Sequence, residues 1–499
     1  MSNHSAFATN LCVVKDLQPS LLWRWFAQIA SIAHPSHHEE ALATFIVEWA
    51  QRQNLNVWRD SAGNVIIKKP ASVGMETRTP IALQAHLDMV PQANAGIVHD
   101  FTKDPLTLRK SPDSKWLLAT DTTLGADNGI GLASILALLE SDLPHPELEA
   151  LLTMTEETGM VGALGLQAGT LSAPIMINTD TEEIGDVYVG CAGGVDADVL
   201  LPLKYMQNTY NNAISITISG LQGGHSGLDI DKNRSSAIKL MARLLSTLRS
   251  VCDEFLLVDI TGGTLRNAIA RESTALIVCN AHHQPQILSA IQKAANDILG
   301  DIAISEPKAR IHHLPTQATC HQAPDKTSSA KMIDLLNALP NGVMRHSDVM
   351  TDTVETSLSL GMVCIKNGQL QTTLLVRSLT DMGKQTICDT IRSVANLAGA
   401  SVHFSGDYVG WNIDPQSKIT PIVCELYANI LGKAPAVKVI HAGLECGLIK
   451  KHYPDMDIVS IGPTINNAHS PDECVDIDSV GIYWQVLTDI VANSPTRTD

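Results

Sequence analysis

Histidine and carboxylate side chains follow several apolar stretches of the chain, where a catalytic metal site could form. The first such stretch, 80–90, alternates in the manner of a strand and contains His86 and Asp88 at its end. Residues two apart in a strand point to the same side, so Asp88 is placed to orient the imidazole of a metal-bound His86. A lone His-x-Asp pair is usually coincidental, so the hypothesis depends on the segments that follow.

Two aspartates lie in comparable positions further along the chain. Asp127 lies at or just before the start of a helix expected at 130–139, and an ordinary helix cap is the alternative interpretation. Asp180 follows a short expected strand at 173–177. Both carboxylates therefore join His86 as candidate metal ligands.

A pair of glutamates and a late histidine complete the set of ligand-type residues. Glu156 and Glu157 follow the apolar strand expected at 148–154, and adjacent residues in extended backbone point in opposite directions. The two carboxylates can therefore have two different roles. His469 follows the strand expected at 457–462.

Strands that alternate with helices predict a mostly parallel sheet, and such sheets bind ligands at the carboxyl ends of their strands. The residues expected at that edge are His86, Asp127, Glu157, Asp180 and His469. Nitrogen and oxygen ligands without cysteine suit a catalytic rather than a structural zinc, or manganese or cobalt. Five ligands exceed the need of one catalytic zinc and suffice for two metals that share a carboxylate. Glu156 is then the natural base for an attacking water.

The chain is too long, at 499 residues, for a single ordinary core. We expect an α/β catalytic domain, with a mostly parallel sheet and helices on both faces, formed by residues 1–190 and 407–499. An inserted α+β domain at 191–406 interrupts it, where alternating strands favour an antiparallel sheet. Near the N-terminus, a helix is expected from Ser36 to about residue 54, with Ser36 and Glu39 as a capping box.

Composition excludes several classes of protein. Hydrophobic residues make up 44% and charged residues 17%, which is typical of globular proteins. The net charge of −17 argues against nucleic acid or an anionic membrane as the main partner. Ten cysteines without a CxxC spacing fit a reducing compartment. Residues 1–16 lack a signal-peptide pattern and no apolar run is long enough to span a bilayer, so a cytoplasmic location is expected.

Several short motifs, in their residues and in their order along the chain, resemble those of a known enzyme family. The motifs are HLD at 86–88, LGADNG at 124–129, TEETG at 155–159, NTD at 178–180 and NNAHSPDE at 466–473. They resemble the dinuclear zinc exopeptidases, which include carnosinase, peptidase T and the aminoacylases. With GGHSG at 223–227 and HAGLECG at 441–447, the chain is most similar to the aminoacyl-histidine (Xaa-His) dipeptidase branch. The resemblance covers essentially the whole chain.

The resemblance implies a role for each residue of the metal site. It divides the ligands into two sets: His86, Asp127 and Asp180 for one ion, and Asp127, Glu157 and His469 for the other. Asp127 is then the bridging ligand, Asp88 orients His86, and Glu156 is the general acid and base. The family likeness also implies a cis peptide bond between Asp127 and Asn128.

By the same resemblance, the inserted domain is a large lid that binds the substrate. His225 is expected to stabilise the oxyanion, and Asn267 and Arg377 to bind the substrate backbone and its C-terminal carboxylate. The planar guanidinium fork of arginine suits a carboxylate. Gly443 is expected near the substrate by family likeness alone. The alternatives are that His225 is an ordinary turn residue and Arg377 a surface charge.

The resulting hypothesis is an enzyme that hydrolyses dipeptides, with Xaa-His dipeptides as the expected substrates and Glu156 as the base. Two divalent metal ions per chain are expected, with zinc favoured and cobalt or manganese as alternatives. Other readings are a tripeptide aminopeptidase, an N-acyl amino acid deacylase, or a non-catalytic metal-binding relative. The expected partner is a small peptide. A homodimer is left open. The inserted domain is longer than the lid of the small-lid dimeric members of the family, so it can supply within one chain the contacts that those members take from a partner subunit.

Overall fold

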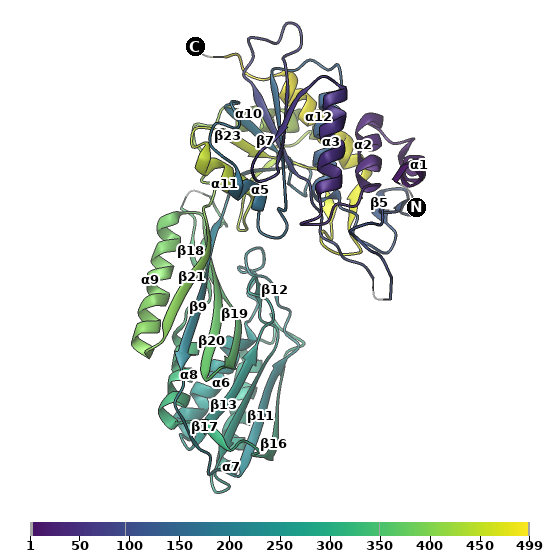
Figure 1. Ribbon diagram of the computed structural model, residues 1–499. Helices are drawn as coiled ribbons and strands as arrows, with labels where there is room; N and C mark the ends of the chain where they lie inside the picture. Colours follow the sequence, from purple (N-terminus) through teal and green to yellow (C-terminus); the bar gives the residue numbers. More distant parts are fainter. Residues whose placement is uncertain (1–2, 95, 349, 498–499) are drawn as a thin grey trace. The chain divides into compact units, whose positions relative to one another are not determined.

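The computed structural model describes residues 3–94, 96–348 and 350–497, which form two compact units (Figure 1). Unit 1 contains residues 1–190, 411–439 and 444–499, and unit 2 contains residues 191–410 and 440–443. The second boundary expected from the sequence, 406/407, differs from this division by four residues. The sequence also assigned 440–443 to the catalytic domain, whereas the structure groups them with unit 2.

Unit 1 is built on an eight-stranded sheet. Its order is β1 (Asn56–Arg59), β2 (Val65–Lys69), β6 (Leu148–Thr153), β3 (Ile81–His86), β7 (Ile175–Asn178), β23 (Asp457–Ser460), β8 (Asp186–Cys191) and β22 (Ala436–Ile440). The four central strands, β6, β3, β7 and β23, are parallel, while β1, β2 and β8 add to them in antiparallel fashion. The parallel centre agrees with the α/β fold class expected from the sequence.

Helices cover this sheet on both faces, as the strand β3 shows. Leu83 and Ala85 point into the main apolar core, whereas the intervening Gln84 contacts Glu445 at the start of α11. The helices of unit 1 are α1 (Asn3–Val14), α2 (Ser20–Ala30), α3 (Glu40–Arg52), α4 (Ala126–Glu140), α5 (Val161–Gly165), α10 (Ile419–Leu431), α11 (Glu445–His452) and α12 (Ile477–Ala492). Helix α4 is apolar on all sides and contacts α2, α12, β3 and β6, so it lies in the centre of the core.

A second, small sheet of unit 1 supports the segment that carries His469. Its order is β24 (Ile465–Asn466), β25 (Cys474–Asp476), β5 (Trp116–Ala119) and β4 (Leu108–Lys110). Because β24 and β25 pair with each other, residues 467–473 form the loop between them. None of the described helices in either unit combines the length and apolar character that a membrane span needs.

Unit 2 contains a nine-stranded sheet whose strands pair in antiparallel fashion. Its order is β16 (Arg310–Gln317), β11 (Asn212–Ser219), β15 (Ser273–Cys279), β13 (Phe255–Gly262), β19 (Val354–Lys366), β20 (Gln369–Ser378), β9 (Gly193–Pro202) and β21 (Ser401–Tyr408), with β18 (Gly342–His346) also paired to β19. Two short pairs join β10 (Tyr205–Gln207) to β17 (Gln322–Pro324) and β12 (Gly224–His225) to β14 (Ala268–Ile269).

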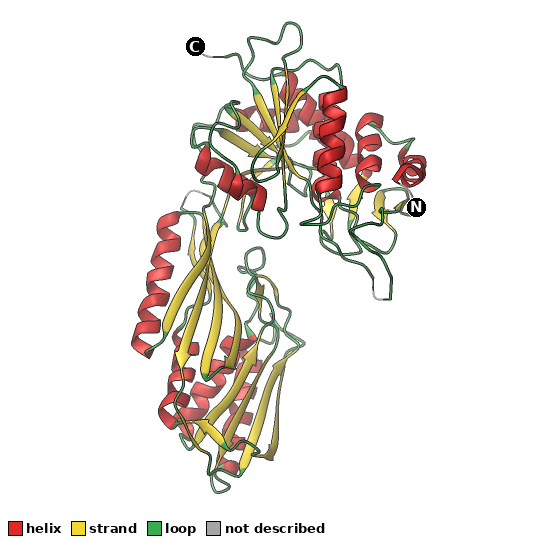
Figure 2. Ribbon diagram, viewed as in Figure 1, coloured by secondary structure: helices red, strands yellow, loops and turns green. Residues whose placement is uncertain are grey.

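Four helices pack against the sheet of unit 2 (Figure 2). They are α6 (Ala237–Val251), α7 (Gln284–Asp301), α8 (Lys326–Ala338) and α9 (Asp381–Ala398). Alternate strand residues, such as Ile214, Ile216 and Ile218, form one apolar core with these helices. Unit 2 is therefore an α+β domain, as the alternating strands predicted.

Candidate metal centre

His86 is the last residue of β3 and is buried. Its Nε2 atom lies 3.3 Å from Asp127 Oδ1 and 3.3 Å from Asp180 Oδ1. Its Nδ1 atom lies 3.0 Å from the backbone oxygen of Asp88 and 3.4 Å from Asp88 Oδ1. One ring nitrogen thus faces two carboxylates while the other is held by Asp88, an arrangement typical of metal-binding histidines.

Asp127 presents its two carboxylate oxygens to two different histidines. Oδ1 lies 3.3 Å from His86 Nε2, and Oδ2 lies 3.3 Å from His469 Nε2. The backbone at Asp127 and Asn128 departs from helical geometry at the start of α4, and the peptide bond between them is cis, as the family likeness implied. This placement is the one that a bridging carboxylate needs.

Glu157 and His469 form the other side of the cluster. Glu157 Oε2 lies 3.0 Å from His469 Nε2. The second oxygen, Oε1, is buried and has no hydrogen-bond partner among the described residues. A buried carboxylate oxygen without a partner is costly, and a bound cation is one way to satisfy it.

The five predicted ligands therefore lie together in unit 1. Among these five residues, two groups offer ligand atoms within 4.8 Å of one another: His86, Asp127 and Asp180, and Asp127, Glu157 and His469. These are the two sets that the family resemblance implied. The nitrogen and oxygen donors, together with the unpaired oxygen of Glu157, fit a pair of divalent cations.

The electrostatics of the cluster are dominated by its carboxylates. The hydrogen bonds that His469 donates to the carboxylates of Asp127 and Glu157 raise the pKa of its imidazole to about 11. Burial alone lowers the pKa of His86, but Asp180 and Asp127 outweigh it and raise that pKa well above its usual value. Histidine binds a metal ion in its neutral form, so a cation bound in this cluster would displace a proton from each imidazole.

Glu156 lies beside the ligands on the turn after β6. Burial, and then the negative charges of Asp180 and Glu157, raise its pKa well above the usual value. One of its oxygens also lies within 4.8 Å of ligand atoms of His86 and Glu157, so distance alone does not separate a base from a ligand. A raised carboxyl pKa is nevertheless what general acid–base chemistry near neutral pH requires.

Asp88 does more than the sequence suggested. Its Oδ1 accepts the backbone N–H of Glu156 at 2.8 Å, and its Oδ2 accepts that of Glu157 at 3.2 Å. The hydroxyl of Ser36 also donates to Oδ2, at 2.7 Å. Burial opposes ionisation of Asp88, but His86 and these donors lower its pKa to about 2. Asp88 is thus a fixed carboxylate that holds the turn bearing both glutamates.

The capping box expected at Ser36 and Glu39 is wrong. Helix α3 begins at Glu40, and neither side chain caps it. Ser36 contacts Asp88 instead, and Glu39 Oε1 accepts the backbone N–H and the hydroxyl of Thr155 at 2.8 and 2.7 Å. Tertiary contacts to the metal centre therefore replaced the local hydrogen bonds that the spacing predicted.

A buried network on the opposite face of the sheet escaped the sequence reasoning. Glu445 Oε2 accepts hydrogen bonds of 2.6 Å from Gln84 Nε2 and from Thr153 Oγ1. Asn178 Nδ2 donates to Gln84 Oε1, so the network joins the ends of β3, β6 and β7. Burial raises the pKa of Glu445 to about 7. The sequence offered two signals for this network: the polar Gln84 inside an otherwise apolar strand, and the family likeness of HAGLECG at 441–447, which places Glu445 near the site without giving it a role.

In unit 2, Arg377 is buried rather than a surface charge. Its Nη1 donates to the hydroxyl of Tyr408 at 2.9 Å, and its Nη2 lies 3.4 Å from His225 Nε2. Its Nε is buried without a hydrogen-bond partner among the described residues. This guanidinium group therefore retains donor capacity for a ligand.

His441 joins the surroundings of Arg377 within unit 2. Ser357, which faces Arg377 across the β19–β20 pair, lies 2.8 Å from His441 Nε2 through its hydroxyl. Burial and then the charge of Arg377 lower the pKa of His441 to about 3, so this imidazole is neutral. Gly443 belongs to the same short segment, 440–443.

The remaining predicted substrate residue, Asn267, is exposed in unit 2. Its backbone oxygen accepts the N–H of Ser226, the residue directly after His225, at 2.8 Å. The neighbouring pair His225 and Ala268 belongs to the β12–β14 ladder. Asn267 thus supports the glycine-rich loop through its backbone, and its exposed side chain remains accessible to a ligand.

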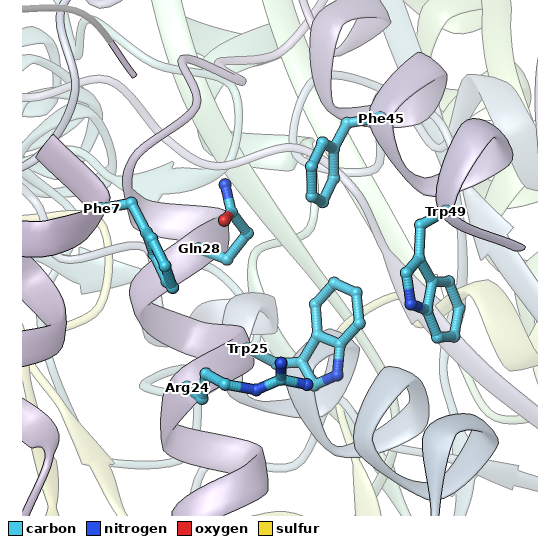
Figure 3. Close-up of a pocket in the computed structure, with 6 residues that line it drawn as sticks. All are labelled: Phe7, Arg24, Trp25, Gln28, Phe45 and Trp49. Carbon is cyan, nitrogen blue, oxygen red and sulfur yellow. The ribbon is translucent and has the colours of Figure 1, made fainter. Parts of the chain in front are cut away.

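A separate pocket of unit 1, of about 120 Å³, lies among helices α1, α2 and α3 (Figure 3). Its lining residues are Phe7, Arg24, Trp25, Gln28, Phe45 and Trp49. Arg24 and Trp25 both contact the carboxylate of Glu140, which fixes α2 to the end of α4. None of the candidate catalytic or metal-binding residues lines this pocket.

The chain belongs to the peptidase family M20/M25/M40, whose family model matches residues 82–493. The matched segment includes all five predicted ligands and Glu156. The chain is therefore a peptide hydrolase of a metal-dependent family, which agrees with the fit of its residues to divalent cations.

Individual relatives are similar over nearly their full lengths. The cytosol non-specific dipeptidase of Escherichia coli (strain K12) is 46% identical over 486 residues, which cover 97% of this chain and 99% of the relative. The crystal structure of aminoacylhistidine dipeptidase from Vibrio alginolyticus is 43% identical, with a TM-score of 0.87, and covers 97% of this chain and 99% of that one. The aminopeptidase PepT from Bacillus cereus shares the fold at 15% identity, with a TM-score of 0.55 over 95% of this chain and 98% of that one.

Proposed function

We propose that the chain is a cytosolic dipeptidase that uses two divalent metal ions and accepts Xaa-His dipeptides among its substrates. The observation that carries the proposal is the convergence of His86, Asp127, Glu157, Asp180 and His469, with Glu156 beside them. The names of the Escherichia coli and Vibrio alginolyticus relatives support the dipeptide substrate, and the former also supports the cytosolic location.

In this proposal the five ligands hold the two ions, with zinc favoured by the donor set and cobalt or manganese as alternatives. When bound, two divalent ions would supply Lewis-acid chemistry: polarisation of the peptide carbonyl and a lower pKa for the attacking water. Glu156 takes the proton from that water and delivers it to the leaving amine, a role for which its raised pKa is suited. Asp88 keeps Glu156 in place through the backbone N–H.

Residues of unit 2 supply the substrate contacts in the proposal. Arg377 binds the C-terminal carboxylate, for which its unpaired Nε and planar fork are suited. His225 stabilises the oxyanion, a contribution of about 3–4 kcal/mol for donors of this kind. Asn267 and Gly443 complete the contacts to the peptide backbone.

The proposal is tested with Glu156→Gln, which keeps the shape of the side chain and removes the base. We expect the variant to keep two metal ions per chain, as measured by inductively coupled plasma mass spectrometry. Its turnover number should fall about 10²–10⁴-fold. A matched control is Glu48→Gln on the exposed face of α3, which should behave as the wild type. A variant that keeps near-normal turnover overturns the role of Glu156.

A substrate panel separates the proposed activity from its rivals. Dipeptides with and without C-terminal histidine, tripeptides and N-acyl amino acids are compared by kcat/KM. Dipeptides should be preferred to both other classes. A preference for tripeptides or acyl amino acids contradicts the proposed substrate class while leaving the metal chemistry intact.

A further inference from the structure

Glu473 is a buried glutamate of unit 1 that no part of the proposed chemistry uses. Its two carboxylate oxygens accept four consecutive backbone N–H groups. Oε2 accepts those of Leu124 and Gly125 at 2.8 and 3.0 Å, and Oε1 accepts those of Ala126 and Asp127 at 2.7 and 3.3 Å. Hydrogen bonds to an ionised acceptor are stronger than neutral ones, and burial strengthens them further.

These N–H groups belong to the turn that delivers Asp127 to the metal cluster. The turn includes Gly125, whose φ of 65° lies in the left-handed region, and ends where α4 becomes regular. The first N–H groups of a helix have no partners within the helix, and a carboxylate at that end also interacts favourably with the helix dipole. Glu473 therefore fixes the backbone on which the bridging carboxylate depends.

Glu473 is also linked to His469, only four residues earlier in the chain. The N–H of Glu473 donates to the backbone oxygen of Ser470 at 2.9 Å, which closes a tight turn after His469. Directly after Glu473, strand β25 pairs with β5 and β24, so the loop is anchored at this end. The His469 ring in turn lies 3.3 Å from Asp127 Oδ2.

We propose that Glu473 is a positioning residue that sets the separation of Asp127 and His469, and thereby the affinity of the ion that these two residues hold with Glu157. The inference rests on the proposed function, because it presupposes the metal site. It adds a residue whose effect comes through the backbone of Asp127 rather than through contact with the ion or the substrate.

The sharpest variant is Glu473→Gln, which keeps the size of the side chain. An amide has one acceptor oxygen and places an NH₂ donor against two of the four N–H groups. We expect the affinity for one of the two cobalt(II) or zinc(II) ions to fall about 10- to 100-fold, as measured by competition with a chromophoric chelator at about pH 8. The visible absorption spectrum of the cobalt(II)-loaded variant should also change, because it reports ligand geometry. Glu473→Asp, which keeps the charge, should recover part of the affinity and serves in place of the amide variant should the latter not fold.

The matched control is Glu149→Gln. Glu149 is also buried, lies at the far end of β6, and accepts the backbone N–H groups of Ser172 and Ala173. Its variant should lose stability but keep both metal affinities and the cobalt spectrum. Unchanged metal binding in both Glu473 variants, or an equal loss in the Glu149 variant, overturns the positioning role.

A reference variant separates failure of this inference from failure of the proposed function. His469→Ala removes a proposed ligand and should weaken the same ion. If His469→Ala weakens it and the Glu473 variants do not, only the inference fails. If His469→Ala also leaves both metal affinities unchanged, the proposed metal site is wrong, and the positioning role of Glu473 is wrong with it.

Discussion

Asp88 Oδ1 accepts the backbone N–H of Glu156 at 2.8 Å, so the residue that follows His86 by two positions also holds the proposed base. The same carboxylate accepts the N–H of Glu157 and the hydroxyl of Ser36. Strand β3 and the turn after β6 are thereby joined at the centre of the site. A single buried carboxylate couples a proposed metal ligand, His86, to the proposed acid–base residue, Glu156.

Asp88→Asn tests this coupling. Both carboxylate oxygens of Asp88 accept hydrogen bonds, whereas an amide has only one acceptor oxygen and a donor NH₂ group in place of the other. The variant therefore loses at least one of the three hydrogen bonds, and the turn that carries Glu156 and Glu157 should shift. We expect kcat/KM for a dipeptide to fall about 10- to 100-fold while most of the bound metal is kept. The control is Asp457→Asn, because Asp457 likewise accepts a serine hydroxyl and two backbone N–H groups, at the other end of the parallel strands. Equal effects of the two substitutions on kcat/KM would show that Asp88 acts only through stability.

Arg377→Lys tests the proposed carboxylate contact. Lysine keeps the charge but lacks the planar fork, so KM for a dipeptide should rise by about 10-fold or more with a smaller change in kcat. Wild-type protein should prefer a dipeptide to the same dipeptide with a C-terminal amide, and the variant should lose most of this preference. Arg310→Lys, on the exposed strand β16, is the control and should retain it. A variant that still discriminates acid from amide rules out Arg377 as the carboxylate ligand.

The pH dependence of stability can be predicted at Glu149. Burial opposes its ionisation, but Lys68, Ser172 and the N–H of Ala173 outweigh burial and lower its pKa below 4.5. A carboxylate with a lowered pKa stabilises the fold above its unfolded pKa, and the contribution is lost as pH falls through the folded value. In urea unfolding, the stability difference between wild type and Glu149→Gln should be constant from about pH 7 to 5 and shrink below about pH 4.5. A difference that grows on acidification contradicts this assignment.

The sequence predicted the elements that carry the site because each has a local apolar pattern. The strand expected at 80–90 corresponds to β3, that at 148–154 to β6, and that at 173–177 to β7. Parallel strands align their carboxyl ends, which places His86, Glu157 and Asp180 at one edge of the sheet. Asp127 reaches the cluster from the start of α4, and His469 from the loop between β24 and β25. The family motifs then predicted how the ligands divide into two sets, and these sets lie together in the structure.

The supporting residues could not be predicted because their partners are distant in sequence. Ser36 lies 52 positions from Asp88, Glu473 lies 346 positions from Asp127, and Glu445 lies 361 positions from Gln84. At Ser36 the local pattern even favoured a helix cap, which is wrong because the hydroxyl contacts Asp88 instead.

The sequence by itself thus determined the chemistry of the ligands and their order along a parallel sheet. Only the tertiary structure decided which buried carboxylates hold the turns that present those ligands. The physical reason is that a buried carboxylate needs hydrogen-bond donors, and here most of the donors are backbone N–H groups. Every residue except proline has such a group, so residue type does not reveal which ones a distant carboxylate will contact.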